Sequence, residues 1–329
     1  MSALAPLLQS FFLERLGRQR QASPQTISAY RDCFKLLLAF AAGQRGKPPS
    51  RLQVEDLDAC LIAAFLDHLE HQRHNSVRTR NARLAAVHSL FSYAALRCPE
   101  QAATIERVLA IPQKRFQPAL VSFLDHQEVA ALLRAPDRTT WTGRRDHALL
   151  AVAAESGLRV SELTALQIAD IRTGSSTYLH CHGKGRKERS TPLTSATSAV
   201  LRTWLKERGG SEQDPVFPTR KGGVLGRSAV EHLIAKYAAL AAGSYPPLAS
   251  KHVTPHVLRH TAAMALLHAG VDTSVIALWL GHQSVETTQI YLHADMTIKE
   301  QALARTTPPQ TTPGRYKPPD ALLAFLDGL

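Results

Sequence analysis

The sequence predicts a mainly α-helical protein, with an N-terminal helical bundle followed by a mixed α/β domain that is mostly helical and holds a small antiparallel β-hairpin. Three observations predict this fold. The 329 residues are enough for two domains, each with a core of its own. Apolar residues recur with a period near 3.6 over the first hundred residues and again in later segments. The period changes to two around residues 177–193, where two short runs flank a basic, glycine-containing turn.

The N-terminal bundle is expected over residues 1–110. Ser23-Pro24 combines an N-cap with a first-turn proline, and the apolar residues that follow lie largely on one helix face. A break rich in glycine and proline at residues 43–50 separates this helix from a second one near 57–69. A third helix begins at Ser76, and the three helices together can bury one apolar core.

Basic side chains gather at the start of the third helix, namely Arg73, Arg78, Arg80 and Arg83. They form either a solvated helix face or a surface that rests on a phosphate backbone, and the pattern by itself favours the solvated face. The whole chain carries a formal net charge of +12, and basic residues are in excess in both halves. Such a balance suits a nucleic-acid partner, although it also serves solubility.

A linker is expected at residues 111–119, which contain two prolines and two adjacent basic residues. The second domain follows over residues 120–305. Its helices are expected at 125–133, 145–156, 158–163, 194–208, 227–241, 254–268, 273–280 and 284–292, with hairpin strands at 177–181 and 188–193. Residues 306–329 form a Pro/Thr-rich spacer that ends in a short apolar segment, which we expect to dock on a neighbouring surface, either of its own subunit or of another one.

Polar residues interrupt the last, otherwise apolar helices. His256 and Arg259 are three apart in the first turns of one helix, so both can reach a single cluster of ligand oxygens. Phosphate fits best, because a guanidinium donates two parallel hydrogen bonds to phosphoryl oxygens. If Arg159 and Arg259 clamp a phosphate, the phenol of Tyr291 can attack phosphorus while the arginines stabilise the developing charge. Taken alone, Tyr291 is more typical of a core residue.

Lys184, on the hairpin turn, is the candidate that protonates the leaving oxygen, because its long side chain can reach into a site. The alternative is a solvated basic tip, since Arg186 and Lys187 lie on the same turn. A metal site is weakly indicated by the spacing of His256 and His260, but the glutamate of the H-E-x-x-H pattern is replaced by Val257. We therefore expect neither a metal nor another cofactor.

The cysteines, Cys33, Cys60, Cys98 and Cys181, are scattered without a CxxC pair. They indicate neither a disulfide framework nor a zinc site, and they suit a reducing cytoplasm. No secretion signal is visible, and no stretch reaches the roughly 18 apolar residues that a membrane span requires. We expect a cytoplasmic protein that does not bind a membrane.

Four segments of the second domain, taken together, resemble the active-site blocks of the tyrosine recombinases, or phage integrases, including Xer-type and transposon-borne members. The segments are ESGLRVSEL at 155–163, HGKGRKERSTPL at 182–193, TPHVLRHTAAMALLHAG at 254–270 and LGHQSVETTQIYLH at 280–293. They occur in the family's order. The N-terminal bundle resembles the family's core-binding, SAM-like DNA-binding domain more weakly.

The resemblance implies a role for each active position. Arg159 and Arg259 would hold the scissile phosphate, while His256 and His282 supply hydrogen bonds and proton transfer. Lys184 would be the acid, and Tyr291 the nucleophile that forms a 3′-phosphotyrosyl link and releases a 5′-hydroxyl. Because bond energy is conserved in that link, neither ATP nor a metal is required. Glu162 matches an acidic position that orients the arginines.

The implied protein is a site-specific recombinase that binds a double-stranded DNA recombination site. It would act as a homo-oligomer, a tetramer on two sites, possibly with a related recombinase. DNA contacts are expected from Arg73, Arg78, Arg80, Arg83, Arg186 and Lys187. Two alternatives stay open at this point: a non-catalytic DNA-binding regulator on the same scaffold, and strand passage as in a type IB topoisomerase. The intact set of active positions argues against the first, and the apolar C-terminal segment argues against the second.

Overall fold

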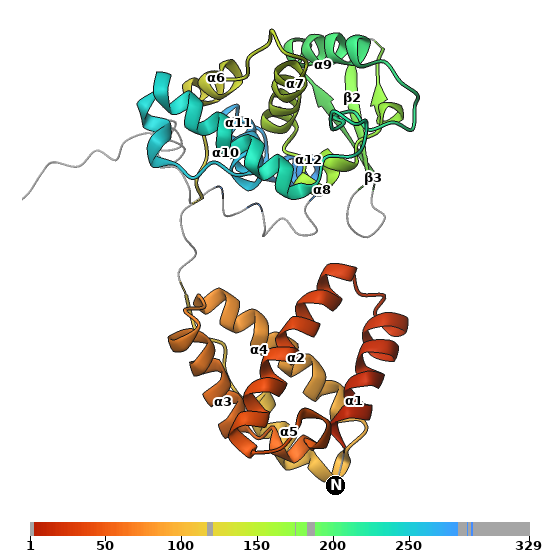
Figure 1. The fold of residues 1–329 in the computed structure, drawn as a ribbon, viewed down its shortest axis with the longest axis vertical. Coiled ribbons are helices and arrows are strands. Elements are labelled where there is room, and N and C mark those ends of the chain that lie inside the picture. Colours follow the sequence, from red (N-terminus) through yellow and green to blue (C-terminus); the bar gives the residue numbers. More distant parts are fainter. Residues whose placement is uncertain are drawn as a thin grey trace, which may run out of the picture. The chain divides into compact units, whose positions relative to one another are not determined.

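The computed structural model describes residues 3–116, 121–174, 176–182 and 188–281, together with Thr288 and Tyr291. The chain divides into two compact units, residues 1–118 and 119–329. Both units are mostly helical, and the second contains a small antiparallel sheet (Figure 1). The predicted fold class is thus confirmed.

The first unit is a helical bundle around one apolar core. Its α-helices are α1 (Leu4–Ser10), α2 (Pro24–Arg45), α3 (Ala59–Asp67), α4 (Val77–Ala94) and α5 (Ala102–Leu109), and π-helical segments at Phe11–Gln19 and His68–Gln72 extend α1 and α3. Short 3₁₀ turns lie at Pro49–Arg51, Val54–Asp56 and Pro99–Gln101. Phe11 is fully buried at the centre, where its ring contacts those of Tyr30, Phe34 and Tyr93. Such aromatic contacts stabilise a core beyond their buried area.

The capping residues begin these helices as expected, but one expected break was wrong. The side chains of Ser23 and Ser76 each accept a hydrogen bond from the backbone three residues on. The helix that Ser23 starts does not break at Gly43, since α2 continues to Arg45. Gly46 ends it in the left-handed conformation, with φ of +62°. A glycine inside a helix weakens it but does not stop it.

The second unit consists of a helical layer and a three-stranded sheet. Its α-helices are α6 (His126–Arg134), α7 (Trp141–Ser156), α8 (Val160–Ala165), α9 (Ser195–Arg208), α10 (Arg227–Ser244), α11 (Pro255–His268) and α12 (Thr273–Leu280), with 3₁₀ turns at Ile168–Asp170 and Pro246–Ser250. The strands β1 (Ile171–Arg172), β2 (Thr177–His182) and β3 (Glu188–Leu193) are antiparallel and lie in that order. In the register of β2 and β3, Cys181 pairs with Arg189.

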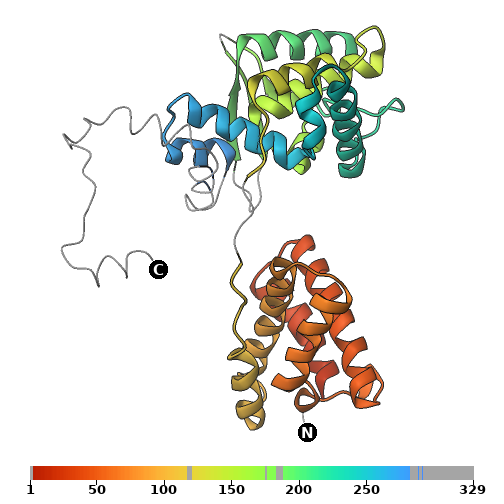
Figure 2. The same ribbon diagram turned by 90° about the vertical axis from the view of Figure 1, so that its left-hand side faces the viewer.

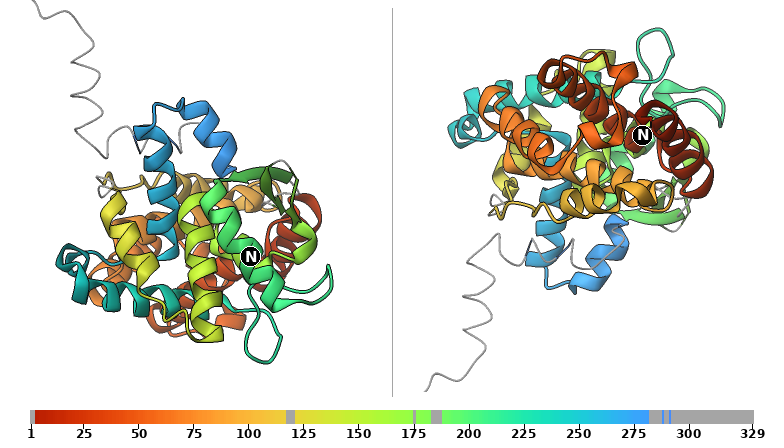
Figure 3. Two further views of the ribbon diagram at one scale, coloured as in Figure 1. Left: turned by 90° about the horizontal axis from the view of Figure 1, so that it is seen from above. Right: turned by 90° about the horizontal axis from the view of Figure 1, so that it is seen from below.

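Helix α7 is the centre of the second unit. It is buried along most of its length and contacts α6, α9, α11 and β3, and Figure 3 shows it between α9 and α11. Helices α11 and α12 lie side by side at one edge of this unit (Figure 2). The C-terminal ends of α7 and α12 and the N-terminal part of α11 therefore meet, which brings together segments from three parts of the sequence.

Candidate active site

The turn between α7 and α8 presents the first arginine. Gly157 ends α7 in the left-handed conformation, with φ of +62°, and Arg159 is the extended N-cap residue of α8. The backbone N–H of Arg159 donates to the Glu162 carboxylate at 2.9 Å, and its guanidinium donates to the same carboxylate at 3.0 Å. Local sequence alone produces this contact, because the first and fourth residues of a helix start face each other.

Glu162 also binds a second arginine, from the sheet. Both terminal nitrogens of Arg189 on β3 donate to its carboxylate, at 3.0 and 2.7 Å. Burial by itself would raise the pKa of Glu162, but the hydrogen bonds and charges of Arg189 and Arg159 lower it to about 2. The carboxylate is therefore ionised at neutral pH and holds two guanidinium groups on one anchor.

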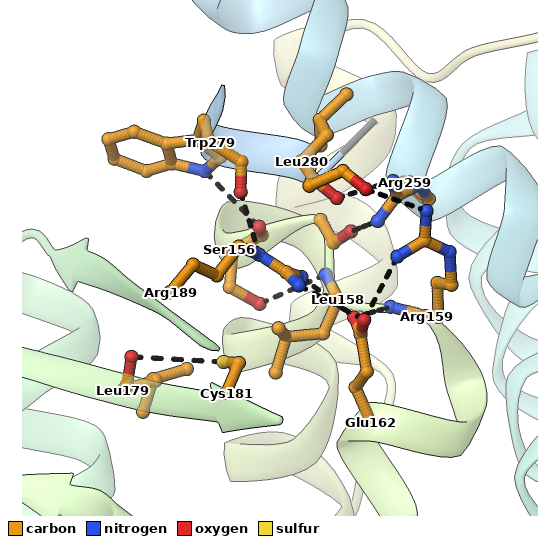
Figure 4. A network of polar contacts seen from close by, with 12 residues as sticks. Ser156, Leu158, Arg159, Glu162, Leu179, Cys181, Arg189, Arg259, Trp279 and Leu280 are labelled. Atoms are coloured by element: carbon orange, nitrogen blue, oxygen red, sulfur yellow. Dashed lines mark hydrogen bonds and ion pairs between the residues drawn. The ribbon is translucent and has the colours of Figure 1, made fainter. Parts of the chain in front are cut away.

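Three successive carbonyls at the C-terminal end of α12 hold three arginines. Arg189 Nε donates to the Trp279 carbonyl at 3.0 Å, Arg259 to the Leu280 carbonyl at 2.7 Å, and Arg159 to the Gly281 carbonyl at 3.0 Å. These carbonyls lack partners within the helix and carry its negative dipole end, so they suit cations. Figure 4 shows the Glu162 carboxylate and the last turn of α12 on opposite sides of the guanidinium groups.

Arg259 is held most deeply, in the first turns of α11. Only 5% of the residue is exposed, and it donates to the carbonyls of Gly157 at 2.6 Å and Leu280 at 2.7 Å. Burial, and then the nearby charge of Arg159, lowers the pKa of Arg259 to about 10, so the group stays charged at neutral pH. A Cβ at Gly157 would lie 2.7 Å from the Leu280 side chain and 3.1 Å from that of Ala262, so a larger residue would displace these neighbours as well as strain the left-handed backbone.

The cluster carries more positive than negative charge. It holds the three guanidinium groups of Arg159, Arg189 and Arg259 against the single carboxylate of Glu162 among the residues that the structure describes. Like charges repel when water is removed, and a bound anion would relieve this repulsion. The arrangement is thus suited to an anionic ligand such as phosphate.

His256, the first residue of the pattern His256-x-x-Arg259, lies at the exposed start of α11. His256 is exposed, and burial of part of its ring, followed by the charges of Arg227 and Arg259, lowers its pKa. It is therefore neutral at neutral pH and can donate or accept one hydrogen bond through each ring nitrogen. The two residues of the pattern thus differ in burial although they share one helix.

Tyr291 lies next to this cluster in the same unit. Its ring is 1% exposed and packs with Ala263, Met264, Ile276 and Leu280, residues of α11 and α12. Burial raises the pKa of the phenol, and the positive charge of Arg259 opposes that rise. The hydroxyl is 3.0 Å from Nδ1 of His260, one residue beyond Arg259 on α11. The phenol of Tyr291 and Arg259, a residue predicted to bind phosphate, are thus neighbours within one chain.

Several predicted residues lie outside the described part of the chain. These are Lys184, Arg186 and Lys187 on the hairpin turn, and His282 after α12. The helix expected at 284–292 lies outside it too, apart from Thr288 and Tyr291.

The four arginines around the start of α4 do not share one environment. Arg73 and Arg78 are exposed and Arg83 is half-buried, whereas only 6% of Arg80 is exposed. The Arg80 guanidinium donates to the side chain of Asn81 at 3.2 Å and to the Pro112 carbonyl at 3.3 Å. Arg80 therefore has contacts within its own unit that a surface arginine would lack.

Sequence reasoning missed two residues of this site, Arg189 and His260. Arg189 lies close to the basic hairpin turn, but strand alternation puts it on the same face of β3 as the buried Thr191 and Leu193. His260 was weighed only as a metal ligand. Its signal is that it lies three and four residues before Ala263 and Met264, on the face of α11 that packs against Tyr291.

Two features are absent from the residues that the structure describes. Within these ranges, no three His, Cys, Asp or Glu side chains come together as ligands for a metal ion. Over the same part of the chain, no helix is both long enough and apolar enough to cross a bilayer.

Comparison with known proteins identifies the family. A model described as the phage integrase family matches residues 122–297, and one described as the phage integrase N-terminal SAM-like domain matches residues 10–97. The chain is 56% identical over 328 residues to a Sinorhizobium fredii protein named integrase/recombinase y4rC, covering 100% of this chain and 99% of that one. It is 32% identical over 313 residues to tyrosine recombinase XerC of Pelobacter propionicus, covering 94% and 99%.

Solved structures agree on the fold. XerH recombinase bound to a palindromic difH substrate matches with a TM-score of 0.67 and 23% identity, over 87% of this chain and 81% of that one. A lambda integrase tetramer bound to a Holliday junction matches with a TM-score of 0.62 and 19% identity, over 86% and 78%. The family resemblance drawn from the four sequence segments is confirmed. The chain belongs to the phage integrase family, the tyrosine recombinases, which are DNA strand transferases.

Proposed function

We propose that this protein is a site-specific recombinase that cleaves and rejoins duplex DNA through a 3′-phosphotyrosyl intermediate. One observation carries the proposal: Arg159 and Arg259 lie together with a surplus of positive charge, and Arg259 is a neighbour of the Tyr291 phenol in the same unit. A phosphodiester is the DNA group that matches both, because it supplies the anion and the electrophile together.

In the proposed cleavage step, Arg159 and Arg259 hold the nonbridging oxygens of the scissile phosphate. The Tyr291 oxygen loses its proton to a neighbouring base and bonds to phosphorus, the bond from phosphorus to the 5′-oxygen breaks, and Lys184 protonates that oxygen. His256 and His282 donate hydrogen bonds to the phosphate as its charge grows. Rejoining reverses these steps with the 5′-hydroxyl of a partner strand, so bond energy is conserved and neither ATP nor a metal is required.

Glu162 is proposed as a positioning residue. Its carboxylate binds Arg159 and Arg189, and the carbonyls at the end of α12 bind the same two arginines from the other side. A guanidinium fixed at both ends loses little freedom when phosphate binds, so its charge is already in place when the reaction begins.

The parts of the chain take separate roles in this proposal. Residues 1–110 form the core-binding domain, 111–119 the linker, 120–305 the catalytic domain, and 306–329 a spacer and docking segment. Phosphate contacts come from Arg73, Arg78, Arg83, Arg186 and Lys187. Arg80 is not among them, because its guanidinium is directed to the Pro112 carbonyl. We propose a tetramer on two recombination sites, in keeping with the lambda integrase tetramer of the same fold.

The test is a nicked DNA site that traps the covalent complex. Tyr291→Phe should abolish the protein–DNA adduct while duplex binding is unchanged, because it removes one hydroxyl and no positive charge. An adduct that persists in Tyr291→Phe would refute the assignment. Transfer of the attached strand to a second DNA site distinguishes recombination from topoisomerase-like strand passage, which reseals the original strand only.

A further inference from the structure

His260 makes a direct contact with the oxygen that reacts. Its Nδ1 is 3.0 Å from the Tyr291 hydroxyl, and the two rings meet at 64° with centroids 5.5 Å apart. Neighbouring side chains hold the phenol from the other directions, since Ala263, Met264 and Ile276 pack around its ring. The contact therefore belongs to a packed arrangement of α11 and α12, and not to two surface side chains that meet by chance.

Burial makes this contact important for the chemistry. A phenol becomes a strong nucleophile only as it loses its proton, and the proton needs an acceptor within hydrogen-bond reach. Tyr291 is 1% exposed, so bulk water and hydroxide do not reach its ring in this structure. Burial also raises the pKa of the phenol, which keeps the free hydroxyl protonated at neutral pH.

The surroundings of His260 keep its imidazole neutral and able to accept a proton. Burial, then the charges of His256 and Arg259, lowers the pKa of His260 to about 4. Helix α12 adds no titratable side chain, because Thr273–Leu280 contains none. On α7, Arg145 and Asp146 bind each other. The Glu155 carboxylate accepts a hydrogen bond from the hydroxyl of Thr194, the N-cap residue of α9. Among the residues that the structure describes, His256 and Arg259 are thus the titratable or charged groups that disfavour protonation of His260.

We propose that His260 is a catalytic residue of strand cleavage, the general base whose Nδ1 holds the Tyr291 hydroxyl and takes its proton. The inference rests on the proposed function, in which Tyr291 is the nucleophile. In the step, the O–H bond of Tyr291 breaks as its oxygen bonds to phosphorus, and the proton moves to Nδ1. The bond to the 5′-oxygen breaks at the same time, and the proton on that oxygen comes from Lys184. Rejoining returns the His260 proton to the departing phenol.

Substrate binding would strengthen this base. A phosphate between Arg159 and Arg259 places negative charge against the guanidinium that disfavours the imidazolium, so the affinity of His260 for a proton rises when DNA is bound. Without DNA, the same guanidinium keeps the base weak and the phenol protonated. The arginine that binds the phosphate thereby couples DNA binding to activation of the nucleophile.

The experiment isolates the attack by Tyr291 from protonation of the leaving group. A nicked site whose 5′-bridging oxygen is replaced by sulfur needs no acid, because a thiolate leaves unprotonated. On this substrate His260→Asn, which keeps a polar group but cannot take a proton, should form the covalent adduct about 100-fold more slowly at neutral pH. The deficit should shrink as pH rises, because a larger fraction of the phenol is then ionised before the attack and needs no base. His252→Asn, at an exposed histidine of the same unit, is the matched control and should react as the unaltered protein does.

Two further measurements test the proposal even if His260→Asn does not fold. His260→Ala should recover adduct formation when free imidazole is added, in proportion to its neutral form. The unaltered protein should show a solvent deuterium isotope effect above one on the sulfur substrate, since the phenol proton is then the one that moves. No isotope effect would overturn the proposal without any His260 variant.

Other outcomes identify what would be wrong. An unchanged rate in a folded His260→Asn overturns the base, and a deficit that is equal at every pH makes His260 a packing residue. A faster rate makes it a latch that restrains Tyr291. If Tyr291→Phe itself still forms the adduct, the proposed function has failed, whatever the His260 variants do.

Discussion

Two arginines, one in each unit, are buried to the same degree but have different surroundings. Arg80 is 6% exposed and Arg259 is 5% exposed, and each donates to backbone carbonyls of distant segments. Arg80 lies beside Asn81, whose amide forms two hydrogen bonds with the backbone of Lys114, so both residues fasten the chain after α5 to α4. Arg259 lies beside a second guanidinium and a phenol.

The difference shows which property marks a functional arginine. Burial and carbonyl contacts are shared by both residues, so neither property separates structure from function. Of the two arginines, only Arg259 lies in a cluster that carries more positive than negative charge. Such a surplus is unfavourable unless an anion binds. The local surplus of charge, and not the burial of one group, therefore points to the phosphate site.

The largest expected effect separates these two arginines directly. Arg259→Ala should slow formation of the covalent adduct about a thousandfold, or about 4 kcal/mol of transition-state stabilisation, with a smaller loss of DNA binding. Arg80→Ala should leave the cleavage rate of folded protein unchanged and lower the melting temperature. Adduct kinetics and thermal melting of both variants check this. Equal losses of binding and cleavage in Arg259→Ala would assign it a structural role.

The second effect concerns the anchor of the cluster. Arg189→Ala leaves the buried Glu162 carboxylate with one arginine in place of two, so the free energy of unfolding should fall by about 3 kcal/mol. Chemical denaturation of the unaltered protein and the variant measures it. Arg172→Ala removes an exposed arginine of the same sheet and is the control. If Arg189→Ala were as stable as the control, the contact between Arg189 and Glu162 would not stabilise the fold.

A pH titration sharpens the same comparison. The pKa of Glu162 is about 2 in the folded chain against an ordinary 4.5, so its contribution to stability is complete above pH 4.5 and is lost as pH falls towards 2. We expect about 2 kcal/mol from this group, allowing for solvent screening. Glu162→Gln should flatten the stability curve between these two pH values. A slope that persists unchanged in the variant would show that other carboxylates cause it.

The smallest effect belongs to the exposed arginines of the first unit. Replacing Arg73 and Arg78 by glutamine should reduce the slope of log affinity against log salt by about 0.9 per lost phosphate contact. Filter binding over a salt series measures the slope, and the same double change should not alter the cleavage rate at saturating DNA. An unchanged slope would return these residues to the solvated face that the sequence pattern alone favours.

Much of the fold could be predicted because the signals are local. Ser23, Ser76 and Thr254 each cap a helix through a residue three positions on, and Gly157 ends α7 where a left-handed residue is needed. The spacing of His256 and Arg259 likewise requires only one helix. The sequence pattern does not predict α1 and α5 as separate helices, because neither begins with a side-chain cap.

The sequence by itself determined the helical bundle, the hairpin, the capped starts and the family of this protein, because each depends on residues near one another in the chain. Only the tertiary structure decided that Arg189 shares Glu162 with Arg159, that the end of α12 holds three guanidinium groups, and that His260 touches Tyr291. These contacts join residues that lie 21 to 122 positions apart. Their geometry depends on how α7, α11, α12 and β3 pack, and spacing along the chain does not encode that packing.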